Sequence, residues 1–197
     1  MPNLKFSQFS AQTDPANVQF LVGYNGTANV RIAPGDLGGG GATSLNGLSD
    51  VLIDTLSEYV GTIPAGLSGN PQGNTTLGIN NGSALTSGIN NTIIGSQTGR
   101  FITSGSHNVI IGTNAGINVS TLSSNVVIGR EAGAGGTGFA VTAIGRLAGL
   151  SGNYSISIGD QVSRFANGVD NIFIGEQAGY ASQGGDGVMG IGKSASR

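Results

Sequence analysis

The sequence predicts an all-β, repetitive fold, a β-roll or β-solenoid of about eight coils with 14–17 residues each. Three observations support this prediction. First, 38% of the residues are hydrophobic, too many for a chain that buries no core, although only 9% are charged and 37 are Gly. Second, the apolar residues are mostly β-branched Ile and Val, which favour strands. Third, one short unit recurs from about residue 74 to residue 197, and it can bury its apolar side chains only by stacking.

The repeat is centred on a large aliphatic residue followed by Gly. Asn stands four residues before this Gly in five units, and a small residue, usually Ala, stands three residues after it. The consensus is N-x-x-I-G-x-x-A-G, followed by a turn rich in Ser, Gly and Asn. The intervals are 17, 17, 17, 16, 14, 16 and 17 residues between the repeat glycines Gly78, Gly95, Gly112, Gly129, Gly145, Gly159, Gly175 and Gly192.

Each unit is expected to form a strand of about four residues, such as Asn108–Ile111, with side chains that alternate between two faces. The position before the Gly is nearly constant, so we expect it to fill the dry interior. The position before that one varies from Thr76 to Phe173 and is expected to face outward, where surroundings differ from coil to coil. A second short strand is expected to carry the Ala. The predicted repeat core is Leu77, Ile94, Ile111, Ile128, Ile144, Ile158, Ile174 and Ile191.

Two further expectations follow from the repeat. The Asn column is expected to satisfy backbone groups, by stacking of its side chains or at turns, rather than to bind a ligand. A slender single roll would leave its second apolar face in water, and association around a threefold axis would bury that face. We therefore expect a homotrimer.

The segments before the repeat differ from it in kind. Residues 1–37 are expected to form a small β module, with strands over 18–24 and 29–32 joined by an Asn25-Gly26 turn. Residues 38–73 begin with four glycines and are expected to be a linker and connecting segment, and residues 74–197 form the repeat. Within the connecting segment, residues 45–63 fit either strands or a short helix, and we favour extended structure.

Several motifs suggest chemistry, and each has a structural explanation that we favour. Gly187–Ser194 matches the pattern of a phosphate-binding P-loop, but its Ile191-Gly192 is the repeat's own dipeptide. His107, the single histidine, occupies a turn position that other coils fill with unrelated residues. The acidic residues Glu131, Asp160 and Glu176 are expected to be solvated, although carboxylates paired across coils are conceivable for glycoside hydrolysis. The turn aromatics could stack on sugars, but we expect them to pack between chains; they are Phe101, Phe139, Tyr154, Phe165 and Tyr180.

Composition also argues against several classes of protein. The net charge is −2 and no basic stretch is present, so nucleic acid is not an expected partner. No apolar run reaches the roughly 18 residues of a membrane helix, and no signal peptide is recognisable at the amino terminus, so membrane insertion and secretion are not expected. There is no Cys, and no metal-binding or catalytic set can be assembled. We expect a structural protein without cofactor, metal or enzymatic activity.

Two stretches resemble known families. The units NNTIIGSQTG, HNVIIGTNAG, NVVIGREAG and NIFIGEQAG resemble repeats of bacteriophage tail-fibre proteins and of the heads of trimeric autotransporter adhesins. This resemblance implies a trimeric left-handed β-roll. The amino-terminal stretch KFSQFSAQTDPANVQFLVGYNGTANVRIAPGDL is similar to the leading segment of phage fibre and other virion appendage proteins, notably those of cyanophages. The resemblance implies that this segment attaches the fibre to the particle, with Phe6, Phe9, Phe20, Tyr24 and Arg31 as candidate attachment residues.

The resemblance therefore predicts a tail or neck fibre in the virion, anchored to another virion protein by its amino-terminal segment. Its trimeric roll would project outward, with a host surface glycan or protein as a further candidate partner. Weak contacts repeated over three chains and many fibres would add up to avidity. Two alternatives stay open: a polysaccharide-degrading, tailspike-like β-solenoid, and a bacterial trimeric adhesin head.

Overall fold

The structure is a computed structural model of the 197-residue chain. The chain divides into two units, residues 1–43 and 44–197, and each is described by itself. The described ranges contain strands and turns but no helix, and hence no helix that could cross a membrane. They comprise the backbone of 21–24 and 29–32, then residues 51–53, 57–68, 71–118, 120–121, 123–134, 136–149, 152–166, 168–182 and 185–196.

The first unit contains a two-stranded antiparallel ladder. β1 (Leu21–Tyr24) pairs with β2 (Asn29–Ile32), and Leu21 lies opposite Ile32. The predicted strand pairing is confirmed over Leu21–Tyr24 and Asn29–Ile32, and residues 18–20 of the predicted first strand lie outside the described residues. Of the candidate attachment residues, Tyr24 and Arg31 lie in these strands, and only their backbone is described. Phe6, Phe9, Phe20, the Asn25-Gly26 turn and the glycines 38–41 lie outside the described residues.

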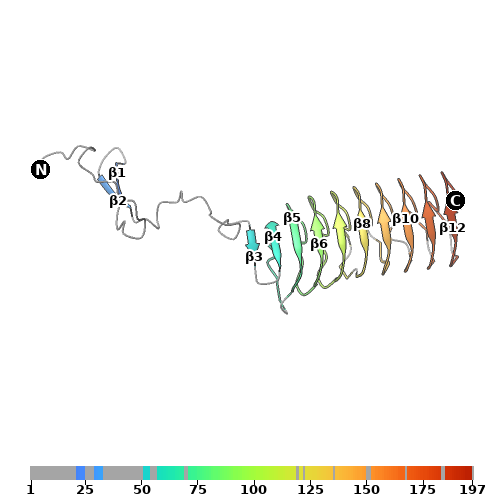
Figure 1. Ribbon diagram of the computed structural model, residues 1–197, viewed down its shortest axis with the longest axis horizontal. Coiled ribbons are helices and arrows are strands. Elements are labelled where there is room, and N and C mark those ends of the chain that lie inside the picture. The colour runs from blue at the N-terminus through green and yellow to red at the C-terminus, as the bar shows by residue number, and fades with distance from the viewer. Residues whose placement is uncertain are drawn as a thin grey trace, which may run out of the picture. The chain divides into compact units, whose positions relative to one another are not determined.

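The second unit is a parallel β-solenoid, as the sequence predicts. Its sheet has ten strands in chain order, and every neighbouring pair from β4 to β12 is parallel (Figure 1). Seven full turns of the chain separate β5 from β12. The strands are β3 (Val51–Ile53), β4 (Glu58–Gly61), β5 (Thr75–Gly78), β6 (Thr92–Ile94), β7 (Val109–Ile111), β8 (Val126–Ile128), β9 (Thr142–Ile144), β10 (Ile156–Ile158), β11 (Ile172–Ile174) and β12 (Met189–Ile191).

Equivalent residues of successive coils lie directly over one another. Ile94 pairs with Ile111 and Ile111 with Ile128, and the same register continues to Ile191. The turns stack as well as the strands, since the Gln97 N–H donates to the carbonyl oxygen of Ile79 at 2.8 Å and the Gly99 N–H to that of Ala115 at 2.8 Å. Differences in coil length from 14 to 17 residues are therefore absorbed in the turns without disturbing the strand register.

The predicted direction of the strand side chains is wrong. The middle residue of each strand points inward, and Ile93, Ile110 and Val127 are fully buried. The predicted core column points outward instead: Leu77 is 50% exposed and Ile191 is 64% exposed, and Ile94, Ile111, Ile128, Ile144 and Ile158 are half-buried. The alternation of side chains between the two faces of each strand was predicted correctly, but alternation alone does not determine which face lies inside the coil. A one-residue change of assignment exchanges the two faces of the whole sheet.

The interior varies because side chains of neighbouring coils share one narrow space. Phe173 is accommodated between the small residues Ser157 and Gly190, and its ring lies so close to Gly179 that a Cβ there would clash with it. Large and small residues thus compensate one another from coil to coil, as close packing requires. The constant position faces outward, where no such compensation is needed.

Two other columns complete the interior. The small residues after the repeat Gly are fully buried at Ala115, Ala132 and Ala178, as expected of a narrow coil, but they lie in a turn rather than in the predicted second strand. Leu85 and Ile102 fill the interior farther along the first coils, and the sequence prediction did not include them.

The buried Asn column forms a hydrogen-bonded ladder, as predicted. Asn91 donates from its backbone N–H and from Nδ2 to Oδ1 of Asn74, both at 3.0 Å, and its Nδ2 also donates to the carbonyl oxygen of Gly105 at 2.9 Å. Asn108 contacts Asn91 Oδ1 in the same way. The ladder is interrupted at Val141, where Asn125 Oδ1 accepts the Val141 N–H but Asn125 Nδ2 has no partner.

The amino-terminal end of the solenoid is closed by an antiparallel strand. β3 runs antiparallel to β4, with Leu52 opposite Tyr59, and Tyr59 is fully buried next to the first coil. The described part of residues 45–63 is therefore extended, as favoured from the sequence. The sheet also begins at β3 rather than at residue 74, so the connecting segment contributes its first two strands.

The repeat Gly has a steric explanation. At Gly112 φ is +128°, and an added Cβ would lie 2.6 Å from the carbonyl oxygen of Gly129 in the next coil. Gly78, Gly129, Gly145, Gly159 and Gly175 show the same close approach of stacked backbones, and a Cβ at Gly95 would lie 2.6 Å from Thr98 Oγ1 and 3.1 Å from the Gly112 carbonyl oxygen.

Gly112→Ala is expected to lower the free energy of unfolding by about 3 kcal/mol, because it combines an unfavourable φ with a clash against backbone. Chemical unfolding followed by circular dichroism measures this. Gly66→Ala is the matched control, since its Cβ would lie 3.4 Å from Thr86 Cγ2. Equal midpoints for the two variants would contradict the steric account.

Asn91→Ala is expected to cost a similar amount, about 3 kcal/mol, because the N–H of Asn108, the Gly105 carbonyl and Asn74 Oδ1 each lose a buried partner. The same unfolding measurement applies. Asn118→Ala, at an exposed position, should leave the midpoint unchanged. An Asn91→Ala variant as stable as the native chain would show that the ladder is dispensable.

Candidate functional site

The outward positions of the strands form a continuous apolar surface, which we call the outer face. It consists of the first and third residues of β5 to β12, which the parallel register arranges in two adjacent columns. Only Thr75, Thr92 and Thr142 interrupt its aliphatic and Met side chains. The first column is Thr75, Thr92, Val109, Val126, Thr142, Ile156, Ile172 and Met189, and the second is Leu77, Ile94, Ile111, Ile128, Ile144, Ile158, Ile174 and Ile191.

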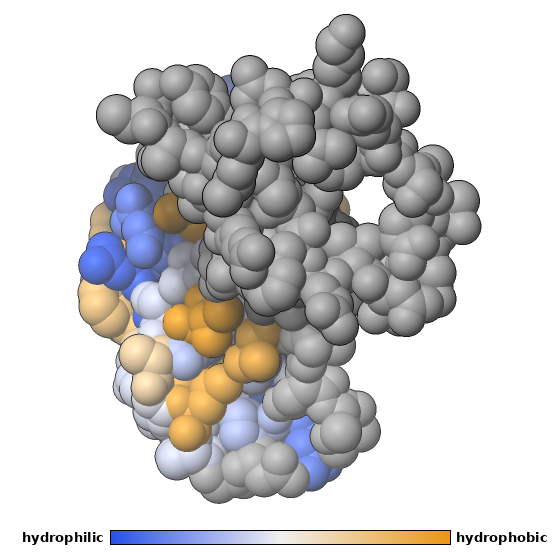
Figure 2. All heavy atoms as spheres, turned by 90° about the vertical axis from the view of Figure 1, so that its left-hand side faces the viewer, coloured by the Kyte–Doolittle hydropathy of each residue, from blue (hydrophilic) through white to orange (hydrophobic). Residues whose placement is uncertain are grey.

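These side chains are only partly covered within the chain. Ile156 and Ile174 are each 37% exposed, and Met189 and Ile191 in the last coil reach 64%. At a strand spacing of about 4.8 Å, the outer face extends over roughly 35 Å. Soluble monomers rarely expose contiguous apolar patches larger than roughly a few hundred Å² to water. An apolar surface that is two columns wide and continues along the whole solenoid is therefore typical of an interface. Figure 2 views the molecule from the left-hand side of Figure 1, and apolar side chains are visible in a group on the described surface.

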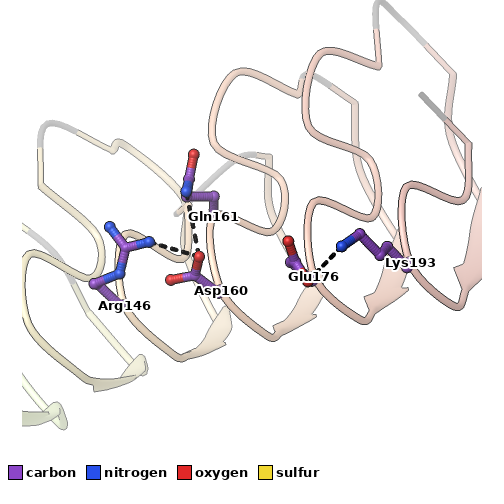
Figure 3. A network of polar contacts seen from close by, with 5 residues as sticks. All are labelled: Arg146, Asp160, Gln161, Glu176 and Lys193. Carbon is purple, nitrogen blue, oxygen red and sulfur yellow. Dashed lines mark hydrogen bonds and ion pairs between the residues drawn. The ribbon is translucent and has the colours of Figure 1, made fainter.

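Charged residues follow the repeat Gly in the later coils, at the border of the outer face. Arg146 Nη2 lies 2.6 Å from Asp160 Oδ2, and Lys193 Nζ lies 3.0 Å from Glu176 Oε2 (Figure 3). Glu131 pairs with its neighbour Arg130. Each of the three carboxylates considered for glycoside hydrolysis is therefore paired with a cation from its own or an adjacent coil. Such pairs, with side chains about one third or more exposed, add little to stability.

The turn aromatics pack against neighbours within the chain. Phe139 and Tyr154 make an edge-to-face pair with ring centroids 5.9 Å apart and an interplanar angle of 85°. Phe165 and Tyr180 make a second pair at 5.3 Å and 90°. Phe101 has no such aromatic partner among the described pairs, but the guanidinium of Arg100 lies 5.2 Å from its ring centroid. The favoured expectation was packing between chains, whereas the pairs seen here lie within one chain, and Phe139, Tyr154 and Phe165 stay 43%, 60% and 55% exposed.

The other motifs do not form sites. Residues 189–191 of the P-loop-like segment are strand β12, and the residues described after them form a turn rather than the helix that a P-loop requires. His107 lies in a turn at φ +61°, a position occupied in the same conformation by Asn90, Ser124 and Tyr154. Within the described ranges, no three His, Cys, Asp or Glu side chains gather where they could hold a metal.

Comparison with known proteins adds no relative: no family model matches the chain, and neither a curated protein nor a solved structure is significantly similar to it. The fold and its surfaces thus define the class of this protein. It is a β-solenoid repeat protein with a buried Asn ladder, an interior of complementary side chains and an apolar outer face.

Proposed function

We propose that this chain is a structural fibre protein of a bacteriophage particle and that it assembles as a homotrimer through the outer face. In this proposal residues 1–37 attach the fibre to another virion protein, and the solenoid projects from the particle toward the host surface. The observation that carries the proposal is the apolar outer face, which runs along all eight repeat strands and is interrupted only at three Thr residues.

The geometry of the outer face supports association of three identical chains. It is two residues wide, so in a threefold arrangement each column can contact one of two neighbours. Its side chains recur at the strand spacing, and a second copy of the same sheet presents a surface with the same spacing. Each aliphatic side chain transferred from water to such an interface contributes on the order of 1 kcal/mol. Summed over eight coils, this gain can exceed the cost of association.

The amino-terminal module supports attachment by a separate part of the chain. Residues 1–43 form their own contact unit, which includes the β1–β2 ladder. The resemblance of this stretch to the leading segment of virion appendage proteins supplies the expected partner, another virion protein. A fibre acts through mechanical stability and repeated weak contacts, and this role requires no catalytic group.

Each of the two alternatives makes a different demand on the protein. A polysaccharide-degrading solenoid would need carboxylates held for acid and nucleophile roles, whereas Asp160 and Glu176 are each engaged by a cation. A bacterial adhesin head would share the trimeric roll but would act at the bacterial surface. The location of the protein, on a virion or on a cell, distinguishes the adhesin from the fibre.

Ile111→Asp is expected to dissociate the trimer, because it places three charges in a dry interface between chains. Sedimentation or light scattering should give the native protein a mass three times the 19.5 kDa of one chain, and the variant a lower mass. Thr113→Asp is the matched control, since it adds the same charge at an exposed position in the same coil. A monomeric native protein, or a variant that stays trimeric, would contradict the assembly.

Antibodies against the solenoid are expected to label an appendage of purified phage particles that carry this chain, as seen by electron microscopy. Particles assembled with a chain lacking residues 1–37 should lose the label, although that chain should still form trimers in solution. Labelling of bacterial cells, with none on particles, would support the adhesin alternative and contradict the fibre.

A further inference from the structure

A polar hollow of about 180 Å³ lies between two turns of the solenoid. One turn, between β7 and β8, contributes Asn118, Ser120, Thr121 and Ser123, and the next, between β8 and β9, contributes Gly136, Thr137, Gly138 and Phe139. None of these residues belongs to the outer face, so the hollow and the proposed trimer contact use different parts of the coil.

The hollow occurs where the repeat departs from its own pattern. Leu85 and Ile102 each follow the repeat Gly by seven residues, are fully buried, and donate their N–H to the carbonyl oxygens of Gly82 and Gly99. Gly136 has the same place in its coil and donates likewise to the carbonyl oxygen of Gly133 at 3.3 Å. Here, however, there is no side chain. Gly136 thus contributes no side chain to the lining of the hollow, at a position where two earlier coils carry a buried aliphatic residue.

The described lining residues combine hydroxyl, amide and aromatic groups, and none of them carries a charged side chain. Four polar side chains of the lining are exposed and make no hydrogen bonds within the described part of the chain: Asn118, Ser120, Thr121 and Thr137. Amides and hydroxyls both donate and accept, so they match a ligand that carries many hydroxyl groups. The absence of charged side chains from this lining disfavours phosphates, carboxylates and cations as ligands.

Phe139 adds an apolar ring that is held in place. Its N–H donates to Asn153 Oδ1 at 2.9 Å, its carbonyl oxygen accepts the Tyr154 N–H at 2.9 Å, and the Tyr154 ring packs against it edge to face. The ring stays 43% exposed at the wall of the hollow. A fixed, accessible aromatic face beside groups that can hydrogen-bond in either direction suits a ligand with one apolar face and a polar rim.

We propose that this hollow binds a single neutral sugar ring, whose C–H face packs on Phe139 and whose hydroxyls bond to Asn118, Thr121 and Thr137. A pyranose has this combination of an apolar face and a hydroxyl rim. The volume admits one ring, so affinity per chain is weak and recognition depends on several copies. This inference names the class of ligand for the host contact in the proposed function, and its biological role rests on that function. Sugar binding itself does not depend on the trimer, because the hollow lies within one chain.

The test uses the full chain in its solution assembly, with the methyl glycosides of glucose, galactose and N-acetylglucosamine as probes and N-acetylneuraminic acid as the anionic comparison. Saturation-transfer and titration by NMR measure binding. At least one neutral sugar should bind with a millimolar dissociation constant. Phe139→Leu should weaken it by about fivefold or more, and Thr137→Val should weaken it as well.

Phe165→Leu is the matched control, because Phe165 is also an exposed member of an edge-to-face pair but does not line the hollow. It should leave the affinity unchanged. No binding by any neutral sugar, an equal loss in the Phe165 and Phe139 variants, or tighter binding of N-acetylneuraminic acid would overturn the proposal. The mass of the same samples separates the two proposals: sugar binding by a monomer contradicts the trimer alone, and a trimer that binds no sugar contradicts the sugar site alone.

Discussion

Backbone hydrogen bonding from coil to coil is the constraint on which the rest of this structure depends. It places each residue over its equivalent in the coil before, in the turns as well as in the strands. Two columns follow directly from that stacking. Gly is required where the backbones approach so closely that a Cβ at Gly112 would meet the Gly129 carbonyl. Asn is favoured where a buried side chain can satisfy backbone groups of its own coil and of the next, as Asn91 does.

The same stacking separates the roles of the two faces. Inside, side chains of successive coils compete for one volume, so a large residue such as Phe173 requires small ones above and below it. Outside, nothing within the chain limits size, yet Ile recurs from Ile94 to Ile191. A constant apolar column without an internal packing reason is best explained by contact with something that repeats at the same spacing, and another copy of the chain does so.

The polar groups of this protein are spread over the coils rather than gathered at one site. The carboxylates of the later coils are paired with cations, the Asn side chains that recur are turned to the backbone, and the hollow beside Phe139 arises where one coil lacks an aliphatic side chain. In the proposals made above, a departure from the repeat binds a ligand, and the regular positions serve stability and assembly. One weak site per chain, repeated over several chains, would bind by avidity.

The sequence alone determined the class of fold, the length of the repeat, the Asn ladder, the burial of the small Ala column and the pairing of β1 with β2, because each leaves a local or periodic pattern. It did not determine which strand face is interior, and the constancy of the Ile column led to the wrong choice. Alternation is the same for both assignments, and only the closure of the coil, which encloses Ile93 and Ile110 and leaves Ile94 and Ile111 outside, decides between them. The hollow beside Phe139 likewise depends on two turns, from different coils, that only the stacking brings together.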